Sequence, residues 1–169
     1  IDSKFKDIKN LPIDLKTKQL GQYPIFVVGD AFTSTPIQHE AAHEGRGAVH
    51  NALNPLKMNN LKTLTPLGIV FSAPEMALIG QNYKQLKEKN IDFVIGMVDY
   101  SHQGRAMVLG QNQGAAEIYV DVKTRKILGA EIFTYAAEHL AHLLAWIIDE
   151  NISIDDALNK PFYHPTLEE

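Results

Sequence analysis

The stretch Ala115–Thr134, "AAEIYVDVKTRKILGAEIFT", decides how we interpret this 169-residue chain. Its first ten residues alternate between apolar and polar side chains, which is typical of a strand with one exposed face. A second strand is predicted in "TRKILGAEIFT", directly after a tight turn. Two strands joined so closely indicate an antiparallel sheet.

The segments on either side of this stretch complete the same pattern. Residues 67–80 predict two short strands around Pro74, residues 81–90 a short polar helix, and residues 91–100 and 104–111 two further strands. Residues 136–151 predict a helix, because Leu140, Leu143, Leu144 and Ile147 form one apolar stripe. A second helix is expected after Ser153, a good N-cap. Strands followed by helices predict an α+β fold, an antiparallel sheet with helices packed on one face.

The first third of the chain has a different character. A loop-rich lead-in precedes a predicted short buried strand at Ile25–Val28, which ends at Gly29-Asp30. A helix is expected over residues 36–53, with Pro36 in its first turn. Residues 55–66 have little periodicity and predict a linker, so we expect a domain boundary there.

Composition excludes several classes of protein. The net charge is −4, which gives no basic surface for nucleic acid, and no apolar run approaches the length of a membrane span. The chain contains no cysteine, so it has neither a disulfide framework nor a thiolate metal site or nucleophile. We expect a cytoplasmic protein.

The end of the chain, "HPTLEE", is the strongest candidate for chemistry. Pro165 favours an extended His164, and Thr166 with Glu169 three residues later predicts a capping box. Glu169 could also hydrogen-bond one imidazole nitrogen of His164, which would fix the tautomer and make the other nitrogen a better base. The two interpretations are compatible.

An alternative chemistry lies in "HEAAH". His39 and His43 would share one helical face, with Glu40 between them and His50 as a further ligand, as in a zinc hydrolase. Short motifs of this kind recur by chance, and we expect no metal. His102, His139, His142 and Trp146 are interpreted as structural or interface residues.

Taken in order, the motifs resemble the C-terminal half of the flavoprotein disulfide reductases, which include dihydrolipoamide dehydrogenase and glutathione reductase. "YPIFVVGDAF" resembles the last strand of the FAD domain, and "PIQHEAAHEG" the helix after it. "GIVFSAPEMALIG" is similar to the entry into the interface domain, and "KTRKILGA" to its strand pair. "AAEHLAHLLAWIIDENISIDDA" resembles the interface helix and its successor, and "HPTLEE" matches the terminal H-P-T-x-x-E.

The resemblance implies specific roles. Asp30 would hydrogen-bond the ribityl chain of FAD, and backbone amides of Ile37, Gln38 and His39 would face the flavin. His164 would take a proton from a dithiol substrate, free or on a lipoyl domain, and Glu169 would orient it. In this family the histidine reaches into the partner subunit, so a homodimer is implied, with FAD and NAD as cofactors of the intact enzyme.

The resemblance also divides the chain. Residues 1–54 would be the end of an FAD-binding domain, 55–66 a linker, and 67–169 the dimerisation domain. The redox-active cysteine pair and the nucleotide fingerprint would lie in the other half of such an enzyme. We therefore expect a fragment that dimerises but, by itself, is inactive and binds no FAD.

The substrate stays open among related enzymes. Leu167 fits the lipoamide pattern, whereas Phe162 replaces a histidine usual there, and Leu20 and Gln38 also depart from the family pattern. We expect a dihydrolipoamide dehydrogenase-like enzyme. A glutathione reductase-type enzyme and a non-catalytic, stand-alone dimerisation module are the alternatives.

Overall fold

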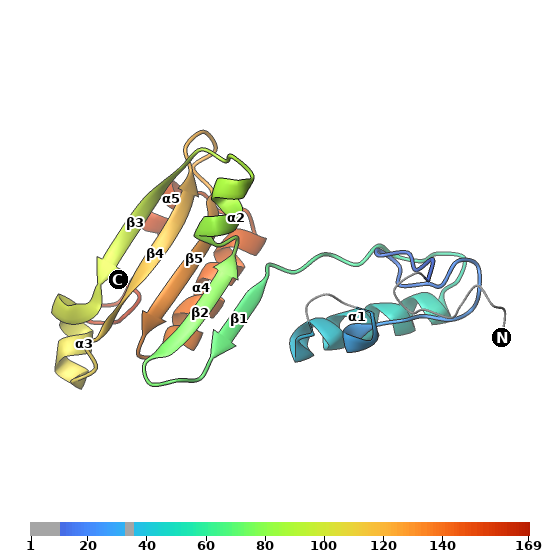
Figure 1. Cartoon of the computed structure of the whole chain (residues 1–169), viewed down its shortest axis with the longest axis horizontal. Helices are drawn as coiled ribbons and strands as arrows, with labels where there is room; N and C mark the ends of the chain where they lie inside the picture. Colours follow the sequence, from blue (N-terminus) through green and yellow to red (C-terminus); the bar gives the residue numbers. More distant parts are fainter. Residues whose placement is uncertain (1–10, 33–35) are drawn as a thin grey trace. The chain divides into compact units, whose positions relative to one another are not determined.

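The computed structural model describes residues 11–32 and 36–169 (Figure 1). The chain divides into two compact units, residues 1–64 and residues 65–169. Each unit is described by itself.

The second unit is built on one antiparallel sheet. Its strands are β1 (Leu67–Val70), β2 (Glu75–Gly80), β3 (Phe93–Asp99), β4 (Gly114–Asp121) and β5 (Ile127–Thr134). Their order across the sheet is β1-β2-β5-β4-β3, so the two strands predicted from the opening stretch lie at its centre. The expected α+β fold with an antiparallel sheet is confirmed.

The turn between β4 and β5 is stabilised by Asp121. Its Oδ1 accepts hydrogen bonds from the backbone N–H groups of Lys123 and Thr124 at 3.0 and 2.6 Å. The hydrogen bond from the Thr124 backbone is the main reason that the pKa of Asp121 lies below its usual value. A carboxylate that accepts several N–H groups fixes a turn in one conformation. The sequence signal "DVKT" is therefore a turn signal with a clear cause.

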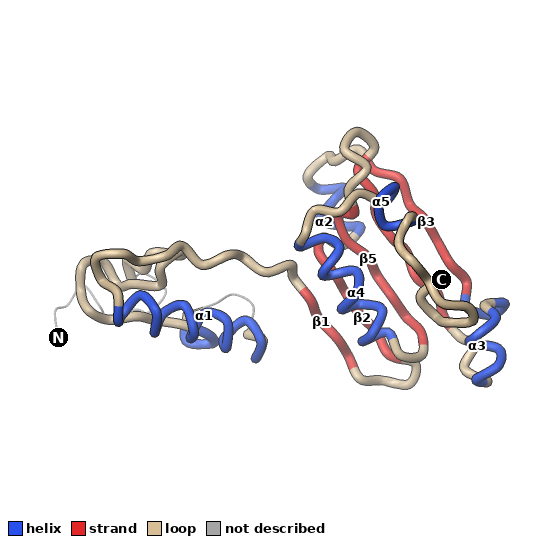
Figure 2. The backbone as a smooth tube through the Cα atoms, turned by 180° about the vertical axis from the view of Figure 1, so that it is seen from behind, coloured by secondary structure: helices blue, strands red, loops and turns tan. Residues whose placement is uncertain are grey.

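Helix α4 (Ala137–Asp149) lies across one face of the sheet, as Figure 2 shows. The contact is made largely by alanines, three on the helix and three on the strands. Those on the helix are Ala137, Ala141 and Ala145, and those on the strands are Ala77, Ala116 and Ala130. Small side chains on both surfaces let the helix backbone approach the sheet closely. Glu75 on β2 accepts a hydrogen bond from the N–H of Glu138 at 3.0 Å, which replaces the side-chain cap that Ala136 cannot supply.

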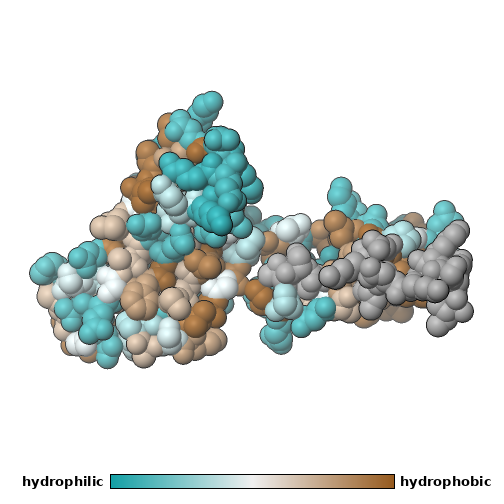
Figure 3. Space-filling view, in the orientation of Figure 1, coloured by the Kyte–Doolittle hydropathy of each residue, from teal (hydrophilic) through white to brown (hydrophobic). Residues whose placement is uncertain are grey.

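The opposite face of the sheet is covered at one end only. There helix α2 (Tyr83–Glu88), which begins with an Asn82 capping box, packs Tyr83 near Phe93 and Tyr119. Burial raises the pKa of Tyr119, and its hydrogen bonds to Glu131 and Glu117 raise it further, so the phenol stays a donor. Beyond α2 this face exposes large apolar side chains, and Figure 3 shows hydrophobic residues gathered over the sheet. We call it the outer sheet face: Val70, Met76, Leu78, Glu117, Glu131 and Phe133.

Residues 104–111 do not form the predicted strand. They form helix α3 (Gly104–Leu109), which follows the short 3-10 turn η4 (Tyr100–His102). The Gln103 side chain accepts the N–H of Ala106, and Gly110 ends the helix at a φ of 66°. These two caps decide the conformation, because the apolar run between them suits either a strand or a buried helix turn.

Helix α5 (Ile154–Leu158) is anchored on the β4–β5 turn. Ser153 caps it as predicted, and its Oγ accepts the N–H of Asp156 at 3.1 Å. Arg125, in the turn, forms two hydrogen bonds to the carboxylate of Asp155, at 2.9 and 2.6 Å. The β4–β5 turn therefore fixes the position of α5, and with it the place where the residues after α5 begin.

The first unit contains helix α1 (Gln38–Leu53) and the 3-10 turn η3 (Gly29–Ala31). The helix agrees with the prediction, but the buried strand at Ile25–Val28 is wrong. Within the described residues Phe26 makes a single bridge to Gln19, and Ile25 is half exposed. One bridge cannot continue into a ladder without a neighbouring strand. The buried side chain of Asn51 joins the helix to the loops around it, through the carbonyls of Thr17 and Asn59.

Among the described residues, no helix is both long enough and apolar enough to span a membrane.

We predict that Gly129→Ala destabilises the second unit by about 1–3 kcal/mol. Gly129 faces Gly80 in the β2–β5 register, and a Cβ at position 129 would clash with the carbonyl oxygen of Gln81. The measurement is urea unfolding. The matched control is Gly68→Ala in β1, where a Cβ has open space, and it should change stability by less than about 1 kcal/mol. Equal stability of the two variants would contradict this account.

Candidate functional site

The candidate base lies in the C-terminal segment, residues 159–169, which follows α5. The side chain of His164 is 81% exposed, whereas that of Glu169 is only 27% exposed. Nδ1 of His164 lies 2.7 Å from Oε2 of Glu169. A carboxylate can only accept, so Nδ1 carries the proton in this pair and Nε2 is left with its lone pair directed away. This arrangement is suited to proton transfer at Nε2.

Two contacts hold the segment against the sheet. Leu167 packs against the main hydrophobic core, and the carbonyl oxygen of Thr166 accepts a hydrogen bond from Nε2 of Gln103 at 2.6 Å. Glu168 lies near buried Tyr100; burial raises the pKa of that phenol, and the negative charge of Glu168 raises it further. The His164-Pro165 peptide bond is cis. The exposed imidazole thus lies on a segment that is held to the domain by a partly buried side chain and a hydrogen bond.

The predicted capping box at Thr166 does not form. No helix follows Leu158 in the part of the chain that the structure describes. Glu169 contacts the side chain of His164 instead of the Thr166 backbone. The second interpretation of "HPTLEE" describes the geometry that is present.

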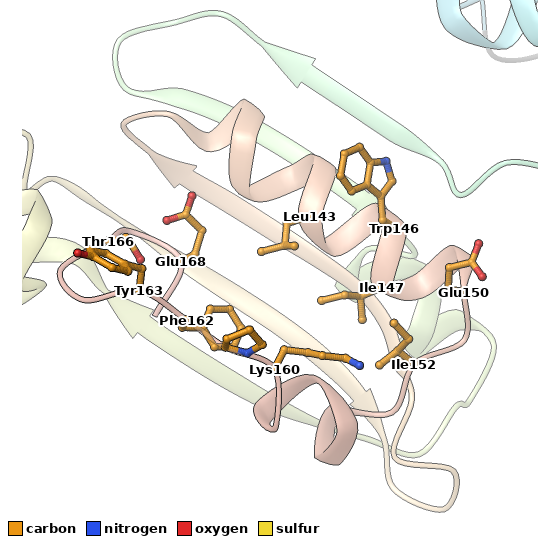
Figure 4. A pocket seen from close by; sticks show the side chains of 11 residues that line it. Leu143, Trp146, Ile147, Glu150, Ile152, Lys160, Phe162, Tyr163, Thr166 and Glu168 are labelled. Atoms are coloured by element: carbon orange, nitrogen blue, oxygen red, sulfur yellow. The ribbon is translucent and has the colours of Figure 1, made fainter.

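A groove separates the C-terminal segment from α4 (Figure 4). It has a volume of 610 Å³ and contains the side chain of Trp146, which is exposed although it is the largest apolar group on the helix. We call this surface the α4–tail face: Leu143, Trp146, Ile147, Phe162 and Tyr163. Its charged groups are of both signs, Lys160 together with Glu150 and Glu168. An exposed apolar surface with aromatic side chains is typical of sites of association.

The residues predicted to contact FAD lie in the first unit. Asp30 is exposed in η3, Ile37 is the N-cap of α1, and Gln38 and His39 open the helix. Residues 33–35, between the two elements, lie outside the described residues. The extended Ile37 supplies no side-chain cap, so the first N–H groups of α1 can donate to an acceptor such as a flavin carbonyl.

Contacts between η3 and α1 keep these groups close together. The N–H of Gly29 donates to Oε2 of Glu44 at 2.7 Å, and Lys18 pairs with the other oxygen at 2.6 Å. Gly29 has a φ of 61°, and a Cβ there would lie 2.9 Å from Cβ of Ala41. The exposed carboxylate of Asp30 and a helix start that Ile37 does not cap fit a cofactor with hydroxyl and carbonyl groups.

Two of the three histidines considered as zinc ligands, His43 and His50, have other partners. Nε2 of His43 lies 2.8 Å from the carbonyl oxygen of Lys62, to which it donates. Nε2 of His50 lies 3.0 Å from Nδ2 of Asn59. Among the residues that the structure describes, no three His, Cys, Asp or Glu side chains come together as a metal site. The geometry therefore gives no support to the zinc hydrolase alternative.

One residue of the site was missed from the sequence. Gln103 was assigned to no role, because the apolar residues after it predicted a strand. The sequence does offer one signal for a helix here. A glutamine three residues before Ala106 and the glycine at Gly110 can cap its two ends.

The fold and the site together define a class: a domain whose exposed, carboxylate-paired histidine lies beside an apolar association surface. Residues 67–169 match the family described as "Pyridine nucleotide-disulphide oxidoreductase, dimerisation domain". The chain belongs to this family.

Similar proteins agree with that assignment. The chain is 30% identical to the dihydrolipoyl dehydrogenase of Mycoplasma pneumoniae, over 86% of this chain and 32% of that protein. It is 28% identical to the dihydrolipoyl dehydrogenase of Bacillus subtilis, over 86% of this chain and 30% of that protein. The chain thus spans about a third of the length of the curated relatives it matches.

Solved structures share the fold. A copper(II) complex of the HOCl-induced flavoprotein disulfide reductase RclA from Escherichia coli matches with a TM-score of 0.80 and 18% identity, covering 94% of this chain and 37% of that chain. LpdA from Mycobacterium tuberculosis matches with a TM-score of 0.80 and 20% identity, covering 94% of this chain and 34% of that chain.

We predict that Glu169→Gln shifts the tautomer of neutral His164 by about tenfold away from the Nδ1–H form, because an amide accepts this proton more weakly than a carboxylate does. The ¹⁵N chemical shifts of the imidazole report the tautomer directly. Glu168→Gln changes the neighbouring charge but leaves the bonded carboxylate in place, so it is the control. Identical tautomer populations in all three chains would contradict the assigned hydrogen bond.

Proposed function

We propose that this chain supplies the dimer interface and the acid–base pair of a dihydrolipoyl dehydrogenase-like flavoprotein disulfide reductase. The observation that carries the proposal is the hydrogen bond between His164 and Glu169, which leaves Nε2 exposed on a dimerisation domain. The substrate class is a dihydrolipoyl dithiol, free or attached to a lipoyl domain. The cytoplasm, where thiols stay reduced, is the compartment we propose.

In this role Nε2 of His164 takes a proton from the substrate thiol, and the thiolate that results is the nucleophile. Glu169 keeps Nδ1 protonated, orients the ring and stabilises the imidazolium that forms. The pair has the same role as the carboxylate–histidine pair in other enzymes that activate a nucleophile. Because this chain has no cysteine, the disulfide that reacts with the thiolate belongs to a different stretch of polypeptide.

FAD, when bound, supplies the route by which two electrons pass from the reduced disulfide to NAD. Asp30 would accept a hydrogen bond from a hydroxyl of the cofactor. The first N–H groups of α1, at Ile37, Gln38 and His39, would donate to its polar edge. The exposed carboxylate and the uncapped helix start support this assignment.

The homodimer forms through the α4–tail face. Of the two apolar surfaces named above, the outer sheet face places Glu117 directly opposite Glu131 in the β4–β5 register. A second copy on that face would bring four carboxylates together, whereas the α4–tail face offers aromatic side chains with charges of both signs. Association through α4 also places the His164 segment at the boundary between the two subunits.

We predict that the chain is a dimer and that Trp146→Glu raises the dissociation constant of the dimer about thirtyfold or more. Truncating or charging a central aromatic residue removes a large part of an interface's affinity. Sedimentation velocity across a concentration series measures the constant. The matched control is Leu78→Glu on the outer sheet face, where the side chain is similarly half exposed and the dimer should persist. A dimer lost in the control and kept in Trp146→Glu would place the interface on the sheet.

The catalytic role is tested in a chimera. The corresponding C-terminal part of the Mycoplasma pneumoniae dihydrolipoyl dehydrogenase is replaced by this chain, and His164→Gln is introduced. We predict that kcat for NAD-dependent oxidation of dihydrolipoamide falls about 10²–10⁴-fold, because general acid–base catalysis is lost.

The same chimera carries its own control. Oxidation of NADH by an artificial one-electron acceptor uses the flavin but needs no proton transfer from a dithiol, so it should stay unchanged. Equal dihydrolipoamide turnover with and without the imidazole would refute the proposed role of His164.

A further inference from the structure

We propose that Gln103 is a positioning residue for His164: its side-chain amide fixes the segment in which the His164–Glu169 pair forms. This inference rests on the proposed function for the meaning of the pair, but the contact that carries it is independent of catalysis. Gln103 lies 61 positions before His164 in the sequence and touches the C-terminal segment only because of the fold.

The Gln103 side chain joins two parts of the domain with its two polar atoms. Oε1 accepts the N–H of Ala106 at 2.8 Å and caps helix α3. Nε2 donates to the carbonyl oxygen of Thr166 at 2.6 Å. Both hydrogen bonds are partly buried, so water competes poorly for them.

The part of the domain that holds Gln103 is rigid. Ala106 is fully buried in the main core, and the N–H of Gln103 donates to the carbonyl oxygen of Tyr100, itself a core residue. A donor that is fixed relative to the sheet can hold a carbonyl group of an otherwise irregular segment. Residues 159–169 have no helix or strand ladder that would do so.

The position of the held carbonyl explains its effect on the candidate base. Thr166 lies between His164 and Glu169, whose side chains meet at 2.7 Å across the loop. Leu167 anchors the loop toward the core, but one apolar contact leaves the loop free to rotate about it. The Gln103 hydrogen bond removes that freedom, so the imidazole and the carboxylate meet in one arrangement.

Glutamine is the residue that makes both contacts. Asparagine is a good N-cap for α3 but is one methylene short of reaching Thr166 as well. Glutamate has the right length and keeps the capping oxygen, but it presents an oxygen where Nε2 must donate. Gln103→Asn and Gln103→Glu therefore both keep α3 capped and lose the link to Thr166, the first without and the second with a change of charge.

The test compares these two variants with the unaltered 169-residue chain. The control is Gln111→Glu, which adds the same charge just after the end of α3. The readouts are the imidazole ¹⁵N shifts of His164, which report the Nδ1–H···Glu169 bond, and ¹³C relaxation of the same ring. Thermal unfolding of each chain reports the integrity of the fold.

We expect both Gln103 variants to lower the ratio of bonded to unbonded His164 about two- to tenfold, the range for one lost hydrogen bond. The ring should also become more mobile, while the control matches the unaltered chain. A merely structural role would lower the unfolding temperature without changing the His164 signals. Unchanged His164 signals in both variants would overturn the proposal, and so would an equal change in the Gln111→Glu control.

The result is separable from the proposed function. A chain that proves monomeric, or a chimera that keeps its turnover without the imidazole, would contradict the proposed function. Neither of those results alters the His164 comparison among the Gln103 variants, which tests the link alone.

Discussion

The close contact between helix α4 and the sheet is the constraint on which the rest of this domain depends. Alanines on both surfaces allow the helix backbone to approach the strands, and a longer side chain at these alanine positions would overpack the contact. Helix α4 is therefore fixed relative to β1, β2 and β5. Its outward side then has a defined shape, on which Trp146 and Leu143 stand beside the C-terminal segment.

The rigid contact between α4 and the sheet explains how an exposed histidine can be well oriented. The segment that carries His164 has no regular structure of its own, and it is directed by the partly buried Leu167, a hydrogen bond from Gln103 and the start position set by α5. Each of these contacts is made by a residue that is itself held to the sheet, directly or through one or two other residues. A base that must act at a subunit boundary needs both features, exposure of its reactive nitrogen and a fixed direction.

Much of this architecture follows from the sequence. The period of α4 and the turn signal at Asp121 gave the helix and the central hairpin, because both patterns are local and unambiguous. Where an apolar run was short, the flanking caps decided the outcome: Gln103 and Gly110 make residues 104–109 a helix. The strand at Ile25–Val28 was wrong for a different reason, since a strand needs a neighbour and the described residues supply one bridge.

The candidate site was predicted only in part. His164 and Glu169 lie close in sequence, so their pairing could be inferred from spacing, and the structure shows them in contact. Their catalytic role and the FAD contacts of Asp30, Ile37, Gln38 and His39 stay predictions. Gln103 could not be found in this way, because a contact across 63 positions leaves no local pattern.

The most direct measurement uses mixed dimers of the chimera and tests the proposal that His164, at the subunit boundary, serves the dithiol site of the partner subunit. One form carries His164→Gln, and the other keeps His164 but has the relative's redox cysteines replaced; each is inactive alone. After equal mixing and subunit exchange, half of the dimers are mixed and each has one complete site, so we predict about a quarter of the unaltered activity. Mixtures that remain inactive although mixed dimers have formed would contradict the account.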